Sequence, residues 1–253
     1  MAKKIIFALQ KGGVGKTTST VITAEILAAS GYRVLVVDFD SQGNATKILT
    51  GESIYKYTGN TVMEAIQYNQ AETYIKEVKE NLDLLPAEDR LAAFSRFIYT
   101  NKVNNPYAVL KRLLEPIESR YDYIFIDVGP SLGDHMINAI VCADQIILPV
   151  DCGDMSIDAM IRFIEFVEAS KEEGHTSADI SGILLTMRDS RSRYERDISE
   201  GIRAAYPDLT FNTEIRRKVK IKEMSGGNIN IQDPAIVDYL SFVEEIIERN
   251  ESQ

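Results

Sequence analysis

A glycine-rich stretch near the start of the chain, residues 10–18 (QKGGVGKTT), constrains the fold more than any other feature. The apolar run at residues 5–9 predicts a buried parallel strand, and residues 18–30 predict a helix packed on a sheet. Strand, glycine loop and helix form the context that a phosphate-binding loop requires. The stretch therefore predicts a loop that binds the phosphates of a nucleotide.

Each residue type in this loop has a physical reason. Glycine has no Cβ, so the backbone can approach phosphate oxygens, and successive N–H groups can point inward at the positive end of the following helix. Lys16 adds a mobile cation for the β- and γ-phosphates, and the Thr17 hydroxyl is placed to ligate Mg²⁺. The predicted nucleotide contacts of the loop are Gly12, Gly13, Val14, Gly15, Lys16, Thr17 and Thr18.

The start of the loop departs from the usual template. Gln10 occupies the position of the first glycine, and a second lysine, Lys11, follows it. This is the deviant Walker A pattern, and it resembles the ParA/MinD group of ATPases, above all the small ParA-type partition proteins. The resemblance implies ATP and Mg²⁺ as ligands. It also implies a homodimer formed on ATP binding, in which Lys11 reaches the nucleotide held by the partner subunit.

A pair of acids follows the second predicted strand. The sequence from Asp38 onward, DFDSQGNAT, resembles the family pattern D-x-D-P-Q-G-N-A-T, with Ser41 in place of the proline. Acids at the carboxyl end of a strand beside the nucleotide loop lie where α/β sheets place their chemistry. By the resemblance, Asp40 orients or activates the attacking water and Asp38 supports the Mg²⁺ shell. Asp40 thus joins Lys11 and Lys16 as a predicted catalytic residue.

A second acidic anchor lies at residues 121–127, a hydrophobic strand that ends in Asp127. This is the Walker B pattern, which is weak alone because strands often end in aspartate but strong beside a phosphate loop. Asp127 is predicted to hold a Mg²⁺-bound water, so the predicted metal site comprises Thr17, Asp40 and Asp127. Gly129 replaces the first proline of the family's D-x-P-P-S pattern, which predicts a more flexible loop.

The rest of the chain alternates apolar runs with amphipathic segments. Further predicted strands cover residues 32–38, 82–85, 145–150 and 180–187. Predicted helices cover residues 61–68, 72–79, 91–99, 107–118, 157–172 and 194–206, and a last helix starts at Asp233. This alternation predicts an α/β, doubly wound, mostly parallel sheet covered by helices on both faces. No linker or repeat divides the chain, so a single ATPase domain is expected over residues 1–253.

Composition and the chain ends bound where such a protein works. No apolar run approaches the length of a membrane span, and the N-terminus leads straight into the first strand, so neither a signal peptide nor a membrane partner is expected. The N-terminal DNA-binding domain of larger partition ATPases is not expected either. Cys142 and Cys152 form no Cys-x-x-Cys pair, which argues against a disulfide scaffold or a zinc site. We therefore expect a cytoplasmic protein.

The net charge of −10 hides a basic segment between Arg188 and Lys222. That segment holds ten bases and six acids, so it is +4 while the rest of the chain is −14. A basic surface on an acidic body suits a polyanion, although mixed charges also fit a solvated surface laced with ion pairs. The candidate DNA contacts are Arg188, Arg191, Arg217, Lys218, Lys220 and Lys222. Arg216 stands where a family proline packs near the base, and is the candidate base contact.

The resemblance implies a bacterial DNA partition ATPase. Its ATP-bound dimer would bind DNA without sequence preference, and a DNA-bound, ParB-like centromere-binding protein would stimulate hydrolysis and release it from the nucleoid. A MinD-like ATPase that positions a protein or a membrane-bound cargo is the alternative. The acidic last helix argues against it, because an interfacial anchor carries a Lys/Arg face. An electron-transfer relative needs cluster cysteines, and neither cysteine follows Asp127 as that motif requires.

Overall fold

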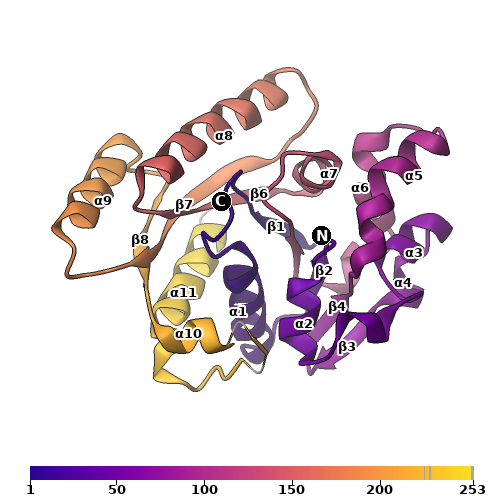
Figure 1. The fold of residues 1–253 in the computed structure, drawn as a ribbon, viewed down its shortest axis with the longest axis horizontal. Helices are drawn as coiled ribbons and strands as arrows, with labels where there is room; N and C mark the ends of the chain where they lie inside the picture. Colours follow the sequence, from indigo (N-terminus) through magenta and orange to yellow (C-terminus); the bar gives the residue numbers. More distant parts are fainter. Residues whose placement is uncertain (225, 228, 252–253) are drawn as a thin grey trace.

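The computed structural model describes residues 1–224, 226–227 and 229–251, and is built on one eight-stranded sheet (Figure 1). The strands are β1 Lys3–Phe7, β2 Val34–Asp38, β3 Lys76–Lys79, β4 Leu82–Leu85, β5 Tyr123–Asp127, β6 Gln145–Asp151, β7 Asp179–Arg188 and β8 Thr210–Arg216. The α-helices are α1 Lys16–Ala29, α2 Asn44–Thr50, α3 Val62–Tyr68, α4 Ala71–Tyr74, α5 Phe94–Thr100, α6 Val109–Leu114, α7 Asp134–Cys142, α8 Asp154–Glu172, α9 Arg193–Ala205, α10 Val219–Met224 and α11 Val237–Glu251. Short 3₁₀ turns cover Ile54–Tyr57, Asp89–Ala93, Pro106–Ala108, Glu118–Arg120 and Pro234–Ile236. Residues 225, 228, 252 and 253 of the expected domain lie outside the described ranges.

The strand order is β3-β4-β2-β5-β1-β6-β7-β8, and every neighbouring pair is parallel except β3 and β4. This confirms the predicted doubly wound, mostly parallel sheet. Strand β1 lies in the middle, between β5 and β6, with β2 one strand further out. The carboxyl ends of these parallel strands meet at one edge of the sheet, where open α/β sheets bind their ligands.

Helices cover both faces of the sheet (Figure 1). Successive residues of β1 explain why. Ile5 and Phe7 pack in a cluster with residues of α1 and α11, including Phe242, whose ring centroid lies 6.0 Å from that of Phe7. Ile6, pointing the opposite way, packs in a second cluster with Met136 of α7 and Phe163 of α8. An unbroken apolar run is the expected sequence of a strand that is buried on both faces.

The helix predicted over residues 72–79 is wrong. Helix α4 ends at Tyr74, and Lys76–Lys79 forms β3, an edge strand antiparallel to β4. A tight turn joins the two strands, and Asn81 in that turn has a φ of 61°. Asparagine tolerates this left-handed conformation better than most residues do. Only partner β4 fixes such a short, exposed strand, so helical periodicity misled the prediction.

Strand β8 is a second element that the sequence did not reveal. Gly182 on β7 makes room for it, because a Cβ there would lie 2.2 Å from the ring of Phe211. Its outer edge is covered by charged side chains. The N–H groups of Asn212 and Thr213 donate to the carboxylate of Glu245 at 2.8 and 3.0 Å, and Arg203 donates to the Phe211 carbonyl at 2.8 Å. Such covering prevents another strand from pairing with an exposed edge.

The remaining predicted elements differ from the structure mainly at their ends. The helix predicted over residues 61–68 is confirmed, and Thr61 caps α3 by accepting from the Met63 N–H at 3.2 Å. The last helix begins as a 3₁₀ turn, whose first N–H groups Asp233 caps. The helix predicted over residues 107–118 is shorter, because a 3₁₀ segment precedes α6 and a turn follows it at residues 115–117. Among the described residues, no helix combines the length and the apolar character that a membrane span needs.

Candidate nucleotide-binding site

The glycine loop connects the end of β1 to the start of α1, as its sequence predicts. Gly13 and Gly15 have φ values of 79° and 88°, in the left-handed region that strains residues with a Cβ. Gly15 is also the N-cap of α1, and no side chain caps this helix end. The positive end of a 14-residue helix is therefore open toward the loop, as an anion site requires.

Lys16 lies at the bottom of the loop, with only 6% of its surface exposed. Its ammonium donates to the Lys11 carbonyl at 2.6 Å. Burial lowers the pKa of Lys16, and the carboxylates of Asp127 and Asp40 oppose that shift. The structure thus brings together the lysine and the two acids that the sequence singled out, within the range of mutual electrostatic influence.

Asp38 and Asp127 lie side by side, as register partners at the ends of β2 and β5, and both are fully buried. The carboxylate of Asp38 is well satisfied, because it accepts from the Thr46 N–H at 2.8 Å and from the Thr46 hydroxyl at 2.7 Å. Burial nevertheless raises the pKa of Asp38. Thr46 was not among the predicted site residues, although it closes the DFDSQGNAT motif.

Neither carboxylate oxygen of Asp127 has a hydrogen bond of standard geometry in the described part of the chain, although the Thr17 hydroxyl lies nearby. Burial, followed by the charge of Asp38, raises the pKa of Asp127 well above its usual value, and the nearby Thr17 hydroxyl and Lys16 ammonium only partly oppose this. A buried carboxylate without a partner is costly, and a cation removes that cost. Asp127 and Thr17 therefore fit Mg²⁺, which usually takes one or two protein ligands and completes its shell with phosphate oxygens and waters.

Mg²⁺ would depend on the nucleotide for its other ligands. Nowhere among the described residues do three or more His, Cys, Asp or Glu side chains gather into a metal site of their own. Cys142 and Cys152 are both buried free thiols.

Asp40 occupies the loop after β2 and is half-buried. Its Oδ1 atom accepts from the Gln42 N–H at 3.1 Å. Its Oδ2 atom lies against Gly129 of the Walker B loop, where an added Cβ would be only 3.1 Å away. The departure from the family pattern at Gly129 therefore gives the Asp40 carboxylate its room. The role of Asp40 toward water stays a prediction.

His135 is a neighbour of this loop that sequence reasoning missed. Its ring packs between those of Phe39 and Phe94, with centroids 5.2 and 5.0 Å away. Its Nε2 atom lies 3.1 Å from the Leu91 carbonyl, and burial lowers the pKa of the imidazole. A lone histidine in the first turn of α7 carries no sequence signal, because its aromatic partners come from distant segments.

Lys11 is held within its own chain. Its ammonium donates to Asp151 Oδ1 at 3.0 Å and to the Ser156 hydroxyl at 2.5 Å. Asp151 ends β6 and Ser156 lies in the first turn of α8. The position of β6 beside β1 brings both residues to the loop. The action of Lys11 on a partner's nucleotide stays a prediction.

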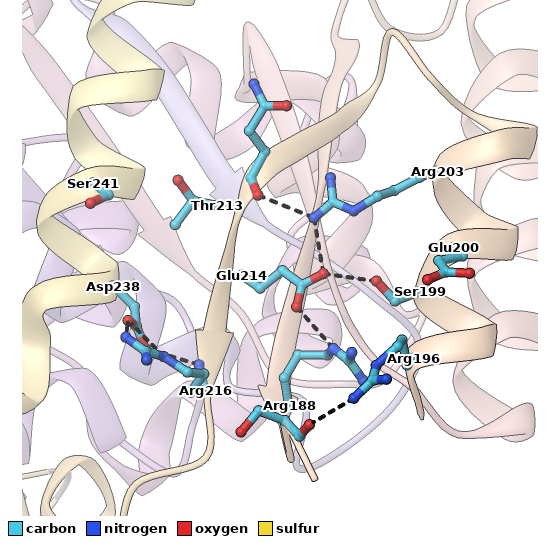
Figure 2. A pocket seen from close by; sticks show the side chains of 12 residues that line it. Arg188, Arg196, Ser199, Glu200, Arg203, Thr213, Glu214, Arg216, Asp238 and Ser241 are labelled. Atoms are coloured by element: carbon cyan, nitrogen blue, oxygen red, sulfur yellow. Dashed lines mark hydrogen bonds and ion pairs between the residues drawn. The ribbon is translucent and has the colours of Figure 1, made fainter. Parts of the chain in front are cut away.

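The basic segment is largely an ion-pair network around a basin of about 670 Å³ beside β8. Figure 2 shows Arg188 and Arg203 pointing toward Glu214, and Arg216 pointing toward Asp238. The Arg188 side chain is 6% exposed and pairs with Glu214 at 3.0 Å. The structure therefore does not support Arg188 as a DNA contact, because its charge is buried and neutralised within the chain.

The other basic candidate residues differ in their exposure and in their ion pairs within the chain. Arg216, the candidate base contact, bonds Asp238 through both its backbone N–H and its guanidinium, and Lys218 lies 3.2 Å from the same carboxylate. Arg191 is 90% exposed and has Asp189 as its ion-pair partner at 3.3 Å. Among the candidate DNA contacts, Arg191, Arg217, Lys220 and Lys222 remain exposed on the surface.

Comparisons with known proteins agree with this geometry. A family model described as an AAA domain matches residues 2–180. The sporulation initiation inhibitor protein Soj of Bacillus subtilis is 36% identical over 254 residues, which cover 97% of this chain and 98% of that protein. The chromosome partitioning protein ParA of Myxococcus xanthus is 30% identical over 258 residues, which cover 97% of this chain and 88% of that protein.

Solved structures give the same answer for the fold. The cobyrinic acid a,c-diamide synthase of Mycobacterium smegmatis, with bound ADP and magnesium, has a TM-score of 0.86 and 25% identity, covering 100% of this chain and 96% of that one. The deviant phosphate loop, the acids at the ends of β2 and β5 and the full-length match to Soj and ParA all point the same way. The chain belongs to the ParA-type partition ATPases, a family of P-loop ATPases.

Proposed function

We propose that this chain is a DNA partition ATPase, a single domain that binds ATP and Mg²⁺ at the loop between β1 and α1. The observation that carries the proposal is the unsatisfied, buried carboxylate of Asp127 beside Lys16 and an uncapped helix end. An anion site and a cation site then adjoin each other. A nucleoside triphosphate bound with Mg²⁺ supplies the anion for the first site and the cation for the second.

The residues of the site divide the work of phosphoryl transfer. Lys16 leaves the Lys11 carbonyl and pairs with the β- and γ-phosphates, while the loop N–H groups and the α1 end bind phosphate oxygens. Thr17 and Asp127 would hold Mg²⁺, with Asp38 next to them, and the bound ion would neutralise charge on the phosphates. Asp40 orients the attacking water, and Lys11 acts on the nucleotide of the partner subunit in an ATP-bound homodimer.

The protein binds DNA in this proposal, through the exposed lysine and arginine side chains of the α9–α10 region. Arg191, Arg217, Lys220 and Lys222 remain on this surface, and a dimer doubles them. Contacts of lysine and arginine with phosphates are independent of sequence and weaken with salt. Binding should therefore place the protein on the nucleoid, in the cytoplasm, until a DNA-bound, ParB-like partner stimulates hydrolysis.

The test is binding to non-specific duplex DNA with ATP·Mg²⁺, with ADP·Mg²⁺ and without nucleotide, across a salt series. We expect tight binding only with ATP·Mg²⁺, falling steeply as salt rises. The Lys16→Ala chain serves as the control, because it should not respond to ATP. Absence of DNA binding in every nucleotide state would contradict the proposed DNA-binding function, and liposome binding would then test the MinD-like alternative.

A further inference from the structure

Lys11 is anchored at both of its ends. Its backbone carbonyl accepts from the Lys16 ammonium at 2.6 Å, and its own ammonium lies against Asp151 and Ser156. The two anchors belong to different parts of the fold, the phosphate loop and the β6–α8 junction. The lysine that the family resemblance assigns to a partner's nucleotide is thus engaged within its own subunit.

The β6–α8 junction is built to receive this ammonium. Strand β6 ends at Asp151, Gly153 is the N-cap of α8, and the Ser156 N–H bonds the Gly153 carbonyl at 2.8 Å. Ser156 is fully buried, and its hydroxyl contacts both Lys11 and Asp151. Lys11 and Asp151 expose only 21% and 28% of their side chains, so water screens the pair only in part. A cation here has a carboxylate and a fixed hydroxyl as partners.

We propose that Asp151 and Ser156 are positioning residues that hold Lys11 in its own subunit and thereby oppose ATP-dependent dimerisation. This inference rests on the proposed function, in which Lys11 reaches across the dimer. One ammonium cannot occupy both places, so each subunit must break the contact before the dimer closes. ATP starts the release, because the phosphates take Lys16 away from the Lys11 carbonyl.

The size of the effect follows from linkage. A contact that exists only in the monomer weakens dimerisation by the free energy of that contact in each subunit. Breaking a partly exposed ion pair changes an equilibrium constant roughly threefold. Two subunits release two contacts, so removing the holding site should raise the dimer association constant about tenfold.

Sedimentation velocity in ATP·Mg²⁺ over a concentration series tests the inference. Asp151→Asn keeps the size of the side chain and removes its charge, and Ser156→Ala removes the hydroxyl. Both variants should dimerise at lower protein concentrations than wild type. Asp154→Asn is the matched control, because Asp154 also lies in the first turn of α8 but bonds the Tyr194 hydroxyl instead. Equal or weaker dimerisation of Asp151→Asn and Ser156→Ala would overturn the holding site.

Lys11→Ala separates this inference from the proposed function. If wild type dimerises with ATP and Lys11→Ala does not, Lys11 acts in the dimer and the Asp151 variants judge the holding site. If wild type and Asp151→Asn both bind ATP and stay monomeric, the proposed dimer fails, and the holding site as a brake on it fails too. Thermal unfolding without ATP should also be non-additive for Lys11→Ala combined with Asp151→Asn, and strict additivity would overturn the pair.

Discussion

Two charged regions lie on the sheet, one near its middle at the carboxyl ends of β2 and β5 and one at the edge strand β8, and they differ in how their charges are paired. At the ends of β2 and β5, Asp127 is buried with no hydrogen-bond partner among the described residues. On β8, the Glu214 carboxylate accepts from Arg188, from Arg203 and from the Ser199 hydroxyl. The carboxylate in the first region thus lacks partners among the described residues, whereas the carboxylate in the second region is fully paired.

Comparing the two regions shows what distinguishes a ligand site from a structural ion-pair network. Both regions have buried charges and shifted pKa values, so neither burial nor a pKa shift identifies a site alone. The two regions differ in whether the carboxylate has hydrogen-bond and ion-pair partners. An unsatisfied buried carboxylate destabilises the chain until a cation arrives, while a paired one stabilises the fold only as long as both partners remain. Substitutions in the two regions should therefore have opposite effects.

Lys16→Ala should have the largest effect. Removing the only loop cation that is buried beside Asp127 should lower ATP turnover at least about 100-fold, since preorganised charge is the main source of catalysis in phosphoryl transfer. Turnover and binding of a fluorescent ATP analogue would measure it, with Lys47→Ala on the exposed face of α2 as the control. Normal turnover in Lys16→Ala would refute the site assignment.

Asp40→Ala should separate binding from chemistry. The variant should bind ATP and dimerise normally, while hydrolysis falls about 100-fold, because positioning of the attacking water is lost. Single-turnover hydrolysis measured beside sedimentation in ATP would show both. Ser41→Ala, one position along the same loop, is the control. Unchanged hydrolysis in Asp40→Ala would remove the proposed role of this carboxylate.

Glu214→Gln should destabilise the fold by about 2 kcal/mol, because it leaves the Arg188 guanidinium buried without its closest partner. Urea denaturation measures this, and Glu200→Gln, an exposed acid on the same basin, should change stability little. Burial alone would raise the pKa of Glu214, but hydrogen bonds from Ser199, Arg203 and Arg188 outweigh it and lower the pKa.

That pKa shift gives the prediction a pH dependence. A lowered pKa stabilises the fold above the unfolded value of 4.5, and the stabilisation is lost as pH falls through the folded pKa. The gap in unfolding free energy between wild type and Glu214→Gln should therefore be full near neutral pH and shrink in acid. A gap that does not change with pH would contradict the assignment of the ion pair.

Arg217→Glu with Lys220→Glu should weaken DNA binding about 100-fold and reduce the salt dependence, because roughly two phosphate contacts are lost. ATP-dependent dimerisation should be spared, since both side chains lie on the exposed α9–α10 region. Lys111→Glu with Arg112→Glu, on α6 across the molecule, is the matched charge reversal (Figure 1). Equal loss in both double variants would mean that net charge, not this surface, governs binding.

Asp127→Asn should show the smallest effect and the reverse sign. Without nucleotide it should stabilise the chain by about 1 kcal/mol, because a neutral amide replaces a buried acid with a raised pKa. The gain should grow as pH rises from the unfolded pKa toward neutrality, where burying an ionisable acid costs most. Thermal unfolding measures it, and a destabilised variant would show that Asp127 is satisfied within the fold.

Short-range patterns in the sequence predict the core of the site. The strand–loop–helix unit follows from one apolar run, glycines at positions that adopt left-handed φ and an amphipathic helix, all within about 30 residues. The acids at the ends of β2 and β5 follow from the same logic, because a buried parallel strand that ends in aspartate places it at the carboxyl edge of the sheet, where ligands bind. These features need no knowledge of what lies beside them.

Features that depend on distant partners could not be predicted. Arg188 counted as a DNA contact because its partner Glu214 is 26 residues away and reaches it only through the β7–β8 pairing. Strand β3 looked helical because its structure depends on β4. Both cases required the sheet to be assembled first.

The family resemblance, the fold class and the nucleotide loop follow from the sequence, because helix periodicity, buried strands and glycine conformation are local properties of the chain. Which charges are available follows only from the packing of distant segments. Arg188 is buried against Glu214, and the Asp40 carboxylate lies against Gly129. Asp151, 140 residues away in the sequence, lies beside Lys11. Electrostatic partners are chosen by proximity in space, and the order of strands in the sheet sets that proximity.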